Sequence, residues 1–146
     1  MKKFLIFRTD RIGDFIASKI IFESIKSNNN KNTIDVICSN YNQSYLKKYN
    51  YINKLIVLDK QNLKNYFSNI LKLIDTKYDY LIVLDGKRRS FIYSLFIRSR
   101  KKFIIVKNKN LKFLKNLFKY TEFLNSERYS QFKNFILSVG VIGAVV

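Results

Sequence analysis

Two aspartates and two arginines lie close together near the start of the chain, in the stretch "FRTDRIGDFIAS" at residues 7–18. Asp14 precedes a run with helical spacing, so its carboxylate could cap a helix. The same position suits a general base, because a carboxylate at the rim of a crevice can accept a proton from a substrate hydroxyl. Asp10 lies beside Arg8 and Arg11, which predicts an ion-paired residue that fixes the loop. From spacing alone, both interpretations of Asp14 stay open.

A second polar stretch, "LDGKRRS", follows a later apolar run with an acid, a glycine and three consecutive cations. We interpret Lys87, Arg88 and Arg89 as contacts for an anionic ligand, with Gly86 allowing the backbone to approach it. A solvated basic turn that opens a helix explains the pattern equally well. If both loops lie at one edge of a sheet, these cations and Asp14 line the same crevice.

The first loop has a single glycine, Gly13, where we expect a tight turn before the helix. It lacks the glycine spacing of a dinucleotide or nucleotide phosphate cradle. The chain has no histidine and one cysteine, so the usual zinc and haem ligand sets are missing, and we expect no metal and no cofactor. Cys38, within the apolar run "IDVICS", is predicted to be a buried side chain rather than a reactive thiol.

The elements that must position these residues follow from the apolar pattern. Short runs rich in β-branched residues predict buried strands at 3–8, 34–38, 55–58, 80–84 and 103–106. Apolar positions three and four residues apart predict helices at 15–26, 62–75 and 89–98. This alternation predicts an α/β domain with a doubly wound, mostly parallel, Rossmann-like sheet. Ligands of such sheets bind outside the carboxyl ends of the strands, so the loops after the first and fourth strands carry the candidate site.

The charge balance favours anionic partners. The chain has 146 residues, and 28 Lys and Arg oppose 10 Asp and Glu for a net charge of +18. A coding bias toward Lys, Asn, Ile, Phe and Tyr is the alternative explanation. The apolar start "MKKFLIF" is too short for a signal peptide, and no run is long enough to span a bilayer. We therefore expect a cytoplasmic protein that is at most peripherally associated with the inner face of the cytoplasmic membrane.

The carboxyl-terminal part holds two further predicted helices. Residues 107–120 place leucines on one helical face and lysines around it, which indicates a core helix with a solvated basic face or a helix lying on an anionic membrane. The stretch after residue 126 predicts a capped helix. We expect one domain over 1–140, with 141–146 as the start of a linker or second domain.

Several linked motifs resemble the amino-terminal half of glycosyltransferase family nine, the lipopolysaccharide heptosyltransferase family. They are "FLIFRTDRIGDFIASKIIFESIK", "IDVICSNYNQSYLKKYNYINKLIVLDK" and "YDYLIVLDGKRRS", and the resemblance covers about residues 3–140. One departure is Tyr51, which stands where the family usually has proline. The resemblance implies the first, acceptor-side domain of a two-domain GT-B fold.

The resemblance also implies a reaction. Family members transfer a sugar, typically heptose from an ADP-activated donor, to the lipopolysaccharide core with inversion and without a required metal. The catalytic aspartate of the family's "G-D" turn matches Asp14, as the base that deprotonates the acceptor hydroxyl. Arg11, Lys87, Arg88 and Arg89 are the candidate acceptor-binding residues, while Asp10, Gly13 and Gly86 are expected to shape the loops.

The implied partners are an anionic glycolipid acceptor, an anionic membrane surface and a donor-binding domain in cis or in trans. The family's second domain holds most of the donor nucleotide, so we expect the chain alone to be weakly active or inactive. A basic nucleic-acid-binding or interaction domain without catalysis is the alternative. We disfavour nucleic acid because the aromatic residues fall mostly at core-spaced positions.

Overall fold

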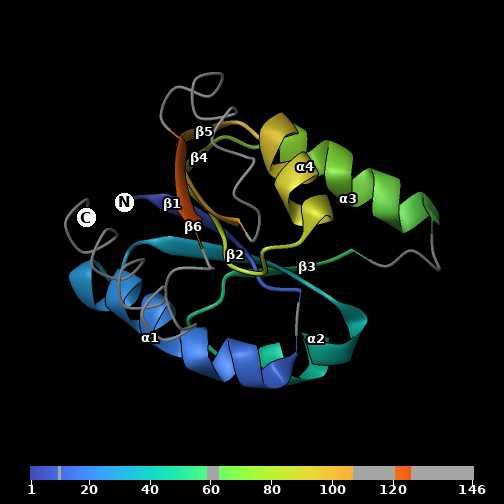
Figure 1. The fold of residues 1–146 in the computed structure, drawn as a ribbon. Helices are drawn as coiled ribbons and strands as arrows, with labels where there is room; N and C mark the ends of the chain where they lie inside the picture. Colours follow the sequence, from blue (N-terminus) through green and yellow to red (C-terminus); the bar gives the residue numbers. More distant parts are fainter. Residues whose placement is uncertain (10, 59–62, 107–120, 126–146) are drawn as a thin grey trace.

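The structure is a computed structural model that describes residues 1–9, 11–58, 63–106 and 121–125 (Figure 1). Strands and helices alternate along most of the chain, as predicted. The elements in chain order are β1 (Lys3–Phe7), α1 (Ile12–Asn28), β2 (Thr33–Cys38), α2 (Asn40–Leu46), β3 (Lys54–Val57), α3 (Leu63–Asp75), β4 (Tyr78–Val83), α4 (Arg88–Phe96), β5 (Ser99–Val106) and β6 (Thr121–Asn125).

The strands form one parallel sheet in the order β3-β2-β1-β4-β5-β6. The chain builds outward from β1 through β2 to β3, then crosses back to add β4 on the other side of β1. The order of strands therefore reverses between β1 and β4. The doubly wound α/β fold predicted from the sequence is confirmed, and this reversal is the topological switch point where such sheets bind ligands.

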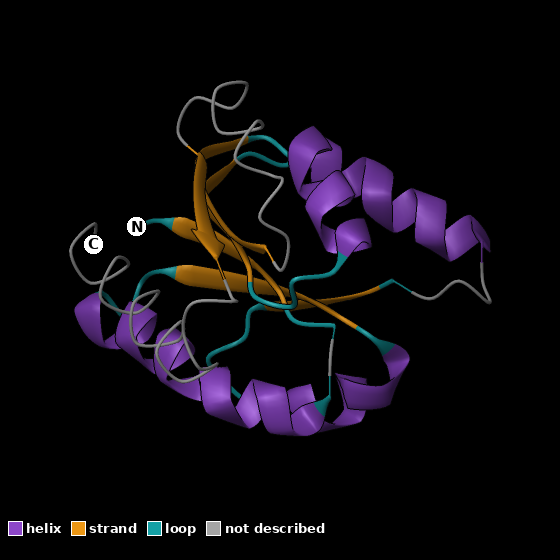
Figure 2. Ribbon diagram, in the orientation of Figure 1, coloured by secondary structure: helices purple, strands orange, loops and turns teal. Residues whose placement is uncertain are grey.

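Helices cover both faces of the sheet (Figures 1 and 2): α1 and α2 lie on one face, α3 and α4 on the other. Side chains alternate along the strands, so β1 sends Phe4 and Ile6 into the core under α1 and Leu5 and Phe7 into the core on the opposite face. All four are fully buried. Burial on both faces of the sheet explains why the strand sequences are nearly continuous runs of apolar residues.

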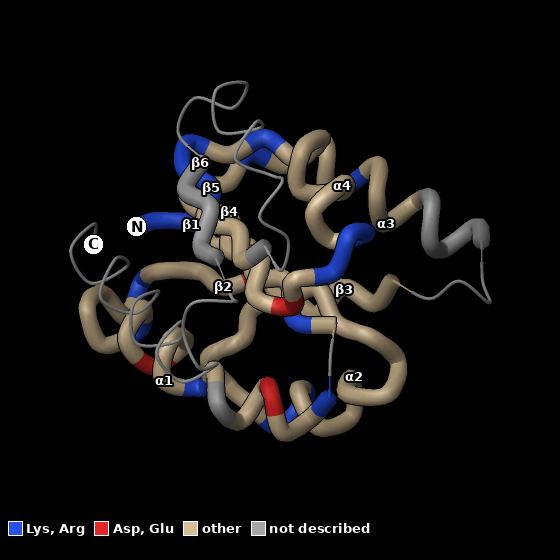
Figure 3. Tube along the Cα trace, in the orientation of Figure 1, with Lys and Arg blue, Asp and Glu red and all other residues tan. Residues whose placement is uncertain are grey.

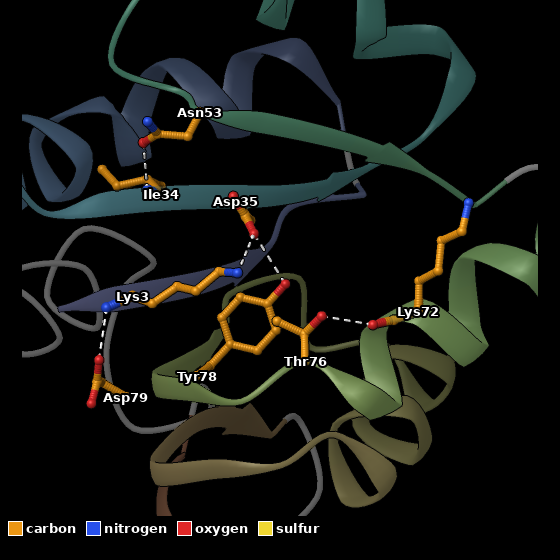
Figure 4. Close-up of polar contacts among 8 residues, drawn as sticks. All are labelled: Lys3, Ile34, Asp35, Asn53, Lys72, Thr76, Tyr78 and Asp79. Carbon is orange, nitrogen blue, oxygen red and sulfur yellow. Dashed lines mark hydrogen bonds and ion pairs between the residues drawn. The ribbon is translucent and has the colours of Figure 1, made fainter.

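A polar cluster lies near the amino ends of β1 and β4, away from the candidate site (Figure 4). The buried Asp35 carboxylate accepts a hydrogen bond from the Tyr78 hydroxyl at 3.1 Å and lies 3.8 Å from the Lys3 ammonium. Burial, followed by the neighbouring Asp35 charge, raises the pKa of the Tyr78 hydroxyl. The Lys3 N–H donates to Asp79 at 2.8 Å, which ties β1 to β4.

All five predicted strands and three of the predicted helices are present. The prediction missed α2 and β6, and it began the first helix at residue 15 although α1 begins at Ile12. The expected helices at 107–120 and after 126, and the segment 141–146, lie outside the described residues. Within the described parts of the chain, no helix has both the length and the hydrophobicity that crossing a bilayer requires.

Candidate functional site at the switch point

The candidate site lies where the carboxyl ends of β1 and β4 meet. Pairing continues one residue beyond the strands, since the Leu84 N–H donates to the Phe7 carbonyl at 3.2 Å. The chain leaves β1 through Arg8 and Thr9 toward α1, and leaves β4 through Leu84 and Asp85 toward α4. The two loops singled out in the sequence are therefore neighbours at one edge of the sheet, as predicted.

Asp14 is the third residue of α1. Arg11 is the N-cap, in an extended conformation, and its carbonyl accepts the N–H of Asp14 at 3.1 Å and that of Phe15 at 3.3 Å. The expectation that Asp14 itself caps the helix is wrong, because α1 begins three residues earlier than that arrangement requires. An anionic side chain in the first turn still interacts favourably with the helix dipole.

The Asp14 carboxylate is half-buried and has no hydrogen-bond or ion-pair partner among the described residues. Its main chain, by contrast, is firmly held. The buried Arg8 guanidinium donates from Nε, at 3.1 Å, and from Nη2 to the Asp14 carbonyl, and from Nη1 to the Leu84 carbonyl at 3.1 Å. The first turn of α1 is thus fastened to the end of β4, and the carboxylate is left uncommitted.

Two of the expected loop-shaping residues in the first loop have different outcomes. Gly13 is the second residue of α1 rather than part of a turn before it, and a Cβ atom there would meet no atom within 4 Å. The turn expected at Gly13 is therefore wrong. Asp10, expected to pair with Arg8 and Arg11, lies outside the described residues.

In the second loop, Gly86 adopts a left-handed conformation with φ of 57°. A residue with a Cβ atom is strained in this conformation, so this glycine shapes the loop. Lys87 is the N-cap of α4, and Arg88 and Arg89 are its first two residues, both exposed. The Lys87 ammonium donates to the Thr9 carbonyl at 2.8 Å and to the Thr9 hydroxyl at 3.2 Å. It thereby bridges the two loops.

Asp85 is a site residue that the sequence analysis did not assign. The residue is 4% exposed. One carboxylate oxygen accepts hydrogen bonds from the hydroxyls of Thr9 and Ser90, at 2.5 Å each, and the other accepts the Lys87 N–H at 3.2 Å. The sequence feature that could have indicated this role is an acidic residue just after a buried strand whose carboxyl end lies at the switch point.

The start of α2 also belongs to this edge. Ser39 and Asn42 form a capping box that closes the first turn of α2. The fully buried Asn42 side chain donates from Nδ2 to the Arg8 carbonyl at 3.1 Å. Three helices therefore begin around the end of β1. Asn42 was also missed, because its partner is a main-chain carbonyl 34 residues away.

The structure brings the expected site residues to one edge without joining the acid to the cations. Figure 3 shows basic residues at the starts of both α1 and α4. Among the described residues, no contact links the Asp14 carboxylate to Lys87, Arg88 or Arg89, and Arg11, Arg88 and Arg89 have no ion-pair partner. The uncommitted Asp14 carboxylate thus lies with Arg11 at the start of α1, and the other cations lie across the switch point at the start of α4.

The remaining reactive group is buried. Cys38 is fully buried, and desolvation, partly opposed by the Lys47 charge, raises the pKa of its thiol to about 12. The expected burial of this thiol is confirmed, and a raised pKa disfavours the reactive thiolate. In the described ranges, no group of three or more His, Cys, Asp or Glu side chains is arranged to hold a metal ion.

Comparison with solved structures places this fold. A glycosyl transferase family 9 structure from Veillonella parvula DSM 2008 matches with a TM-score of 0.71 and 19% identity, over 96% of this chain and 42% of that chain. E. coli heptosyltransferase WaaC with ADP matches with a TM-score of 0.72 and 10% identity, over 95% of this chain and 46% of that chain. The structure of MT0777 matches at 0.65 and 13% identity, over 99% and 98% of the two chains.

The predicted resemblance to family nine is confirmed at the level of the fold, since identities this low support no finer statement. The chain spans less than half the length of the two glycosyltransferases, which agrees with the first half of a GT-B fold. No family model matches the sequence, and no curated protein matches it.

Proposed function

We propose that the chain is the acceptor-side domain of a heptosyltransferase-like glycosyltransferase. One observation carries the proposal: an Asp14 carboxylate without a described partner lies at the switch point, on a helix turn that Arg8 fastens to the sheet. The fold likeness to a family 9 glycosyl transferase and to WaaC adds support. The substrates we propose are an ADP-activated sugar, typically heptose, and an anionic acceptor of the lipopolysaccharide-core type.

In this mechanism Asp14 is the general base. Its carboxylate takes the proton of the acceptor hydroxyl while that oxygen forms a bond to the anomeric carbon of the donor. The bond from the anomeric carbon to the diphosphate oxygen breaks on the opposite face, and ADP leaves with the bonding electrons. Attack and departure on opposite faces invert the anomeric centre. Arg8 contributes by holding the Asp14 main chain, which limits how far the carboxylate can move.

The exposed cations suit the acceptor. Arg11, Arg88 and Arg89 can pair with its phosphate or carboxylate groups, and planar guanidinium groups bind such anions with two parallel hydrogen bonds. Lys87 contributes mainly a fixed positive charge, because two donor directions of its ammonium are already used by Thr9. These assignments place Lys87, Arg88 and Arg89 across the switch point from the base, and Arg11 beside the base at the start of α1.

Full turnover is expected to need a second domain, in cis or in trans. Stabilising the leaving diphosphate is usually the larger part of catalysis, and family nine enzymes hold the donor nucleotide mostly in their second domain. Nucleic-acid binding is not favoured, because the aromatic strand side chains with described burial are enclosed in the two apolar cores and cannot stack on bases: Phe4, Phe7, Tyr78, Tyr80 and Phe103.

A transfer assay tests the proposal. The full chain, alone and mixed with a family nine donor domain, is given ADP-heptose and a lipopolysaccharide-core acceptor, and release of ADP is measured. We expect little turnover from the chain alone and turnover on reconstitution that Asp14→Asn abolishes. Full activity of the reconstituted Asp14→Asn variant would contradict the role of Asp14, and turnover by the chain alone near that of full-length enzymes would contradict the need for a second domain.

A further inference from the structure

Asp85 is a buried carboxylate in the candidate site that has no described cationic partner. Its three described donors are two hydroxyls and one main-chain N–H. Burying a charge is costly unless hydrogen bonds compensate for the lost water. A buried carboxylate of this kind fixes the orientation of the groups around it, because each described donor points toward the carboxylate.

Its donors come from both loops of the site. Thr9 follows β1, whereas Lys87 and Ser90 belong to the start of α4, and the Thr9 contact spans 76 residues of sequence. The Thr9 hydroxyl donates to Asp85 and also accepts from the Lys87 ammonium at 3.2 Å. Because a hydroxyl has one proton, donation to Asp85 turns its lone pairs toward Lys87. Asp85 thereby sets the orientation that binds the Lys87 ammonium.

We propose that Asp85 is a positioning residue for the anion-binding side of the site. It holds the Thr9 hydroxyl and the Lys87 N-cap, so that the Lys87 ammonium and the exposed Arg88 and Arg89 keep a fixed separation from the α1 turn that carries Asp14. The use of this separation, to seat an anionic acceptor opposite the base, rests on the proposed function. The loop-to-loop coupling itself does not.

The first experiment needs no ligand. Nuclear magnetic resonance spectra of the full chain are compared for wild type and Asp85→Asn, following the Lys87 side-chain ammonium signal and the Thr9 amide. We expect the ammonium signal, which its hydrogen bonds protect from exchange with water, to be lost in Asp85→Asn, and the Thr9 amide to shift. An unchanged Lys87 ammonium signal together with an unchanged Thr9 amide would overturn the inference, because a purely local structural role would leave both unaffected and confine the changes to the main chain of 84–91.

Asp35→Asn is the matched control for loss of a buried, hydrogen-bonded carboxylate. Asp35 is 5% exposed and accepts from Tyr78 away from the site. We expect this variant to lose stability but to keep the Lys87 ammonium signal. If Asp85→Asn does not fold, the pair Thr9→Ser and Thr9→Val decides. Serine keeps the hydroxyl and should keep the signal, whereas valine has a similar shape without the hydroxyl and should lose it; equal signals in the pair would overturn the inference.

The second experiment measures binding of glucose 6-phosphate, with glucose as the neutral probe. For wild type we expect chemical-shift changes at the start of α4 with the phosphate only, and for Asp85→Asn an affinity about fivefold weaker, as expected when part of a charge-assisted contact is lost. Equal affinity in the two proteins would overturn the proposed effect on the anion site. Absence of wild-type binding would count against the proposed function, while the ligand-free signals still decide the role of Asp85.

Discussion

The buried Arg8 guanidinium donates two hydrogen bonds to the main-chain carbonyl of Asp14. Arg8 also donates to the Leu84 carbonyl, so one side chain ties the end of β1, the first turn of α1 and the end of β4 together. The candidate base is therefore placed through its backbone, while its carboxylate has no described hydrogen-bond or ion-pair partner.

Replacement of Arg8 by lysine tests this anchor. A single ammonium cannot supply the planar fork that reaches both carbonyls, so at least one buried carbonyl loses its charged donor. We expect Arg8→Lys to lower the free energy of unfolding by about 2–3 kcal/mol, measured by urea denaturation. Arg100→Lys is the control, because Arg100 is exposed and its one described ion pair, with Asp79, is long at 3.8 Å. This substitution should change the free energy of unfolding by less than about 1 kcal/mol. Equal effects of the two substitutions would contradict the anchor.

The Asp14→Asn variant separates catalysis from stability. The amide keeps the size of the side chain but cannot take up the acceptor proton, so we expect the transfer rate of the reconstituted enzyme to fall by about 10²–10⁴-fold. No described residue makes a hydrogen bond or ion pair with the carboxylate that the substitution would remove. The free energy of unfolding should therefore fall by no more than about 1 kcal/mol, the size of a favourable helix-dipole interaction.

Glu23→Gln is the matched control for Asp14→Asn. Glu23 lies on the same helix and pairs at the surface with Lys19 at 3.1 Å, with half of its side chain exposed. We expect its transfer rate to equal that of wild type. A similar loss of rate in both variants would indicate that α1 acts through its overall charge and that Asp14 has no special role.

The sequence was sufficient to predict the strands and helices whose residues are buried in a regular pattern. Strands buried on both faces are continuous apolar runs, and their alternation with helices predicted the switch point correctly. The start of α1 was missed because the residues on its buried face begin at Phe15, whereas Ile12 is exposed. Helix α2 was missed because it is short and polar, with only Asn42 and Leu46 buried.

The interior of the site was harder to predict. The expected pairing of Arg8 with Asp10 stays a prediction, because Asp10 lies outside the described residues. The described partners of Arg8 are main-chain carbonyls, which every residue has and no pattern of side chains reveals. The role of Asp85 depends on Thr9, far away in the sequence. Exposed cations and an acidic residue near the start of a helix can be recognised from residue types and their spacing. The contacts that orient these side chains depend on which strands become neighbours in the sheet.

Cys38 and Tyr49 predict how stability depends on alkaline pH. Desolvation raises the pKa of Cys38 from 9.0 to about 12, and the hydrogen bond from Tyr49 to Tyr45 is the main cause that raises the pKa of Tyr49 from 10.0 to about 12. The folded state keeps these protons while the unfolded state releases them. Their stabilisation is therefore complete below about pH 9 and is lost as the pH rises toward 12.

Urea denaturation at pH 8, 9.5 and 10.5 measures this loss, to which Cys38 alone contributes about 1.4 kcal/mol per pH unit inside the window. Cys38→Ala removes its contribution, so the variant should lose stability less steeply than wild type above pH 9. Parallel curves for the two proteins would show that the thiol ionises equally easily in both states. Thiol titration at pH 8 should likewise detect Cys38 only after unfolding.

Two glycines are expected to respond oppositely to alanine. Gly13 lies exposed in the first turn of α1 with no atom near a new Cβ, so Gly13→Ala should raise the free energy of unfolding by about 0.5–1 kcal/mol. Gly86 has a φ of 57°, so Gly86→Ala should lower it by about 1–2 kcal/mol. Urea denaturation of both variants compares them directly. A destabilising Gly13→Ala would indicate that Gly13 lies in a turn before the helix, as the sequence analysis expected. A helix that begins at Ile12 predicts that the substitution stabilises the protein.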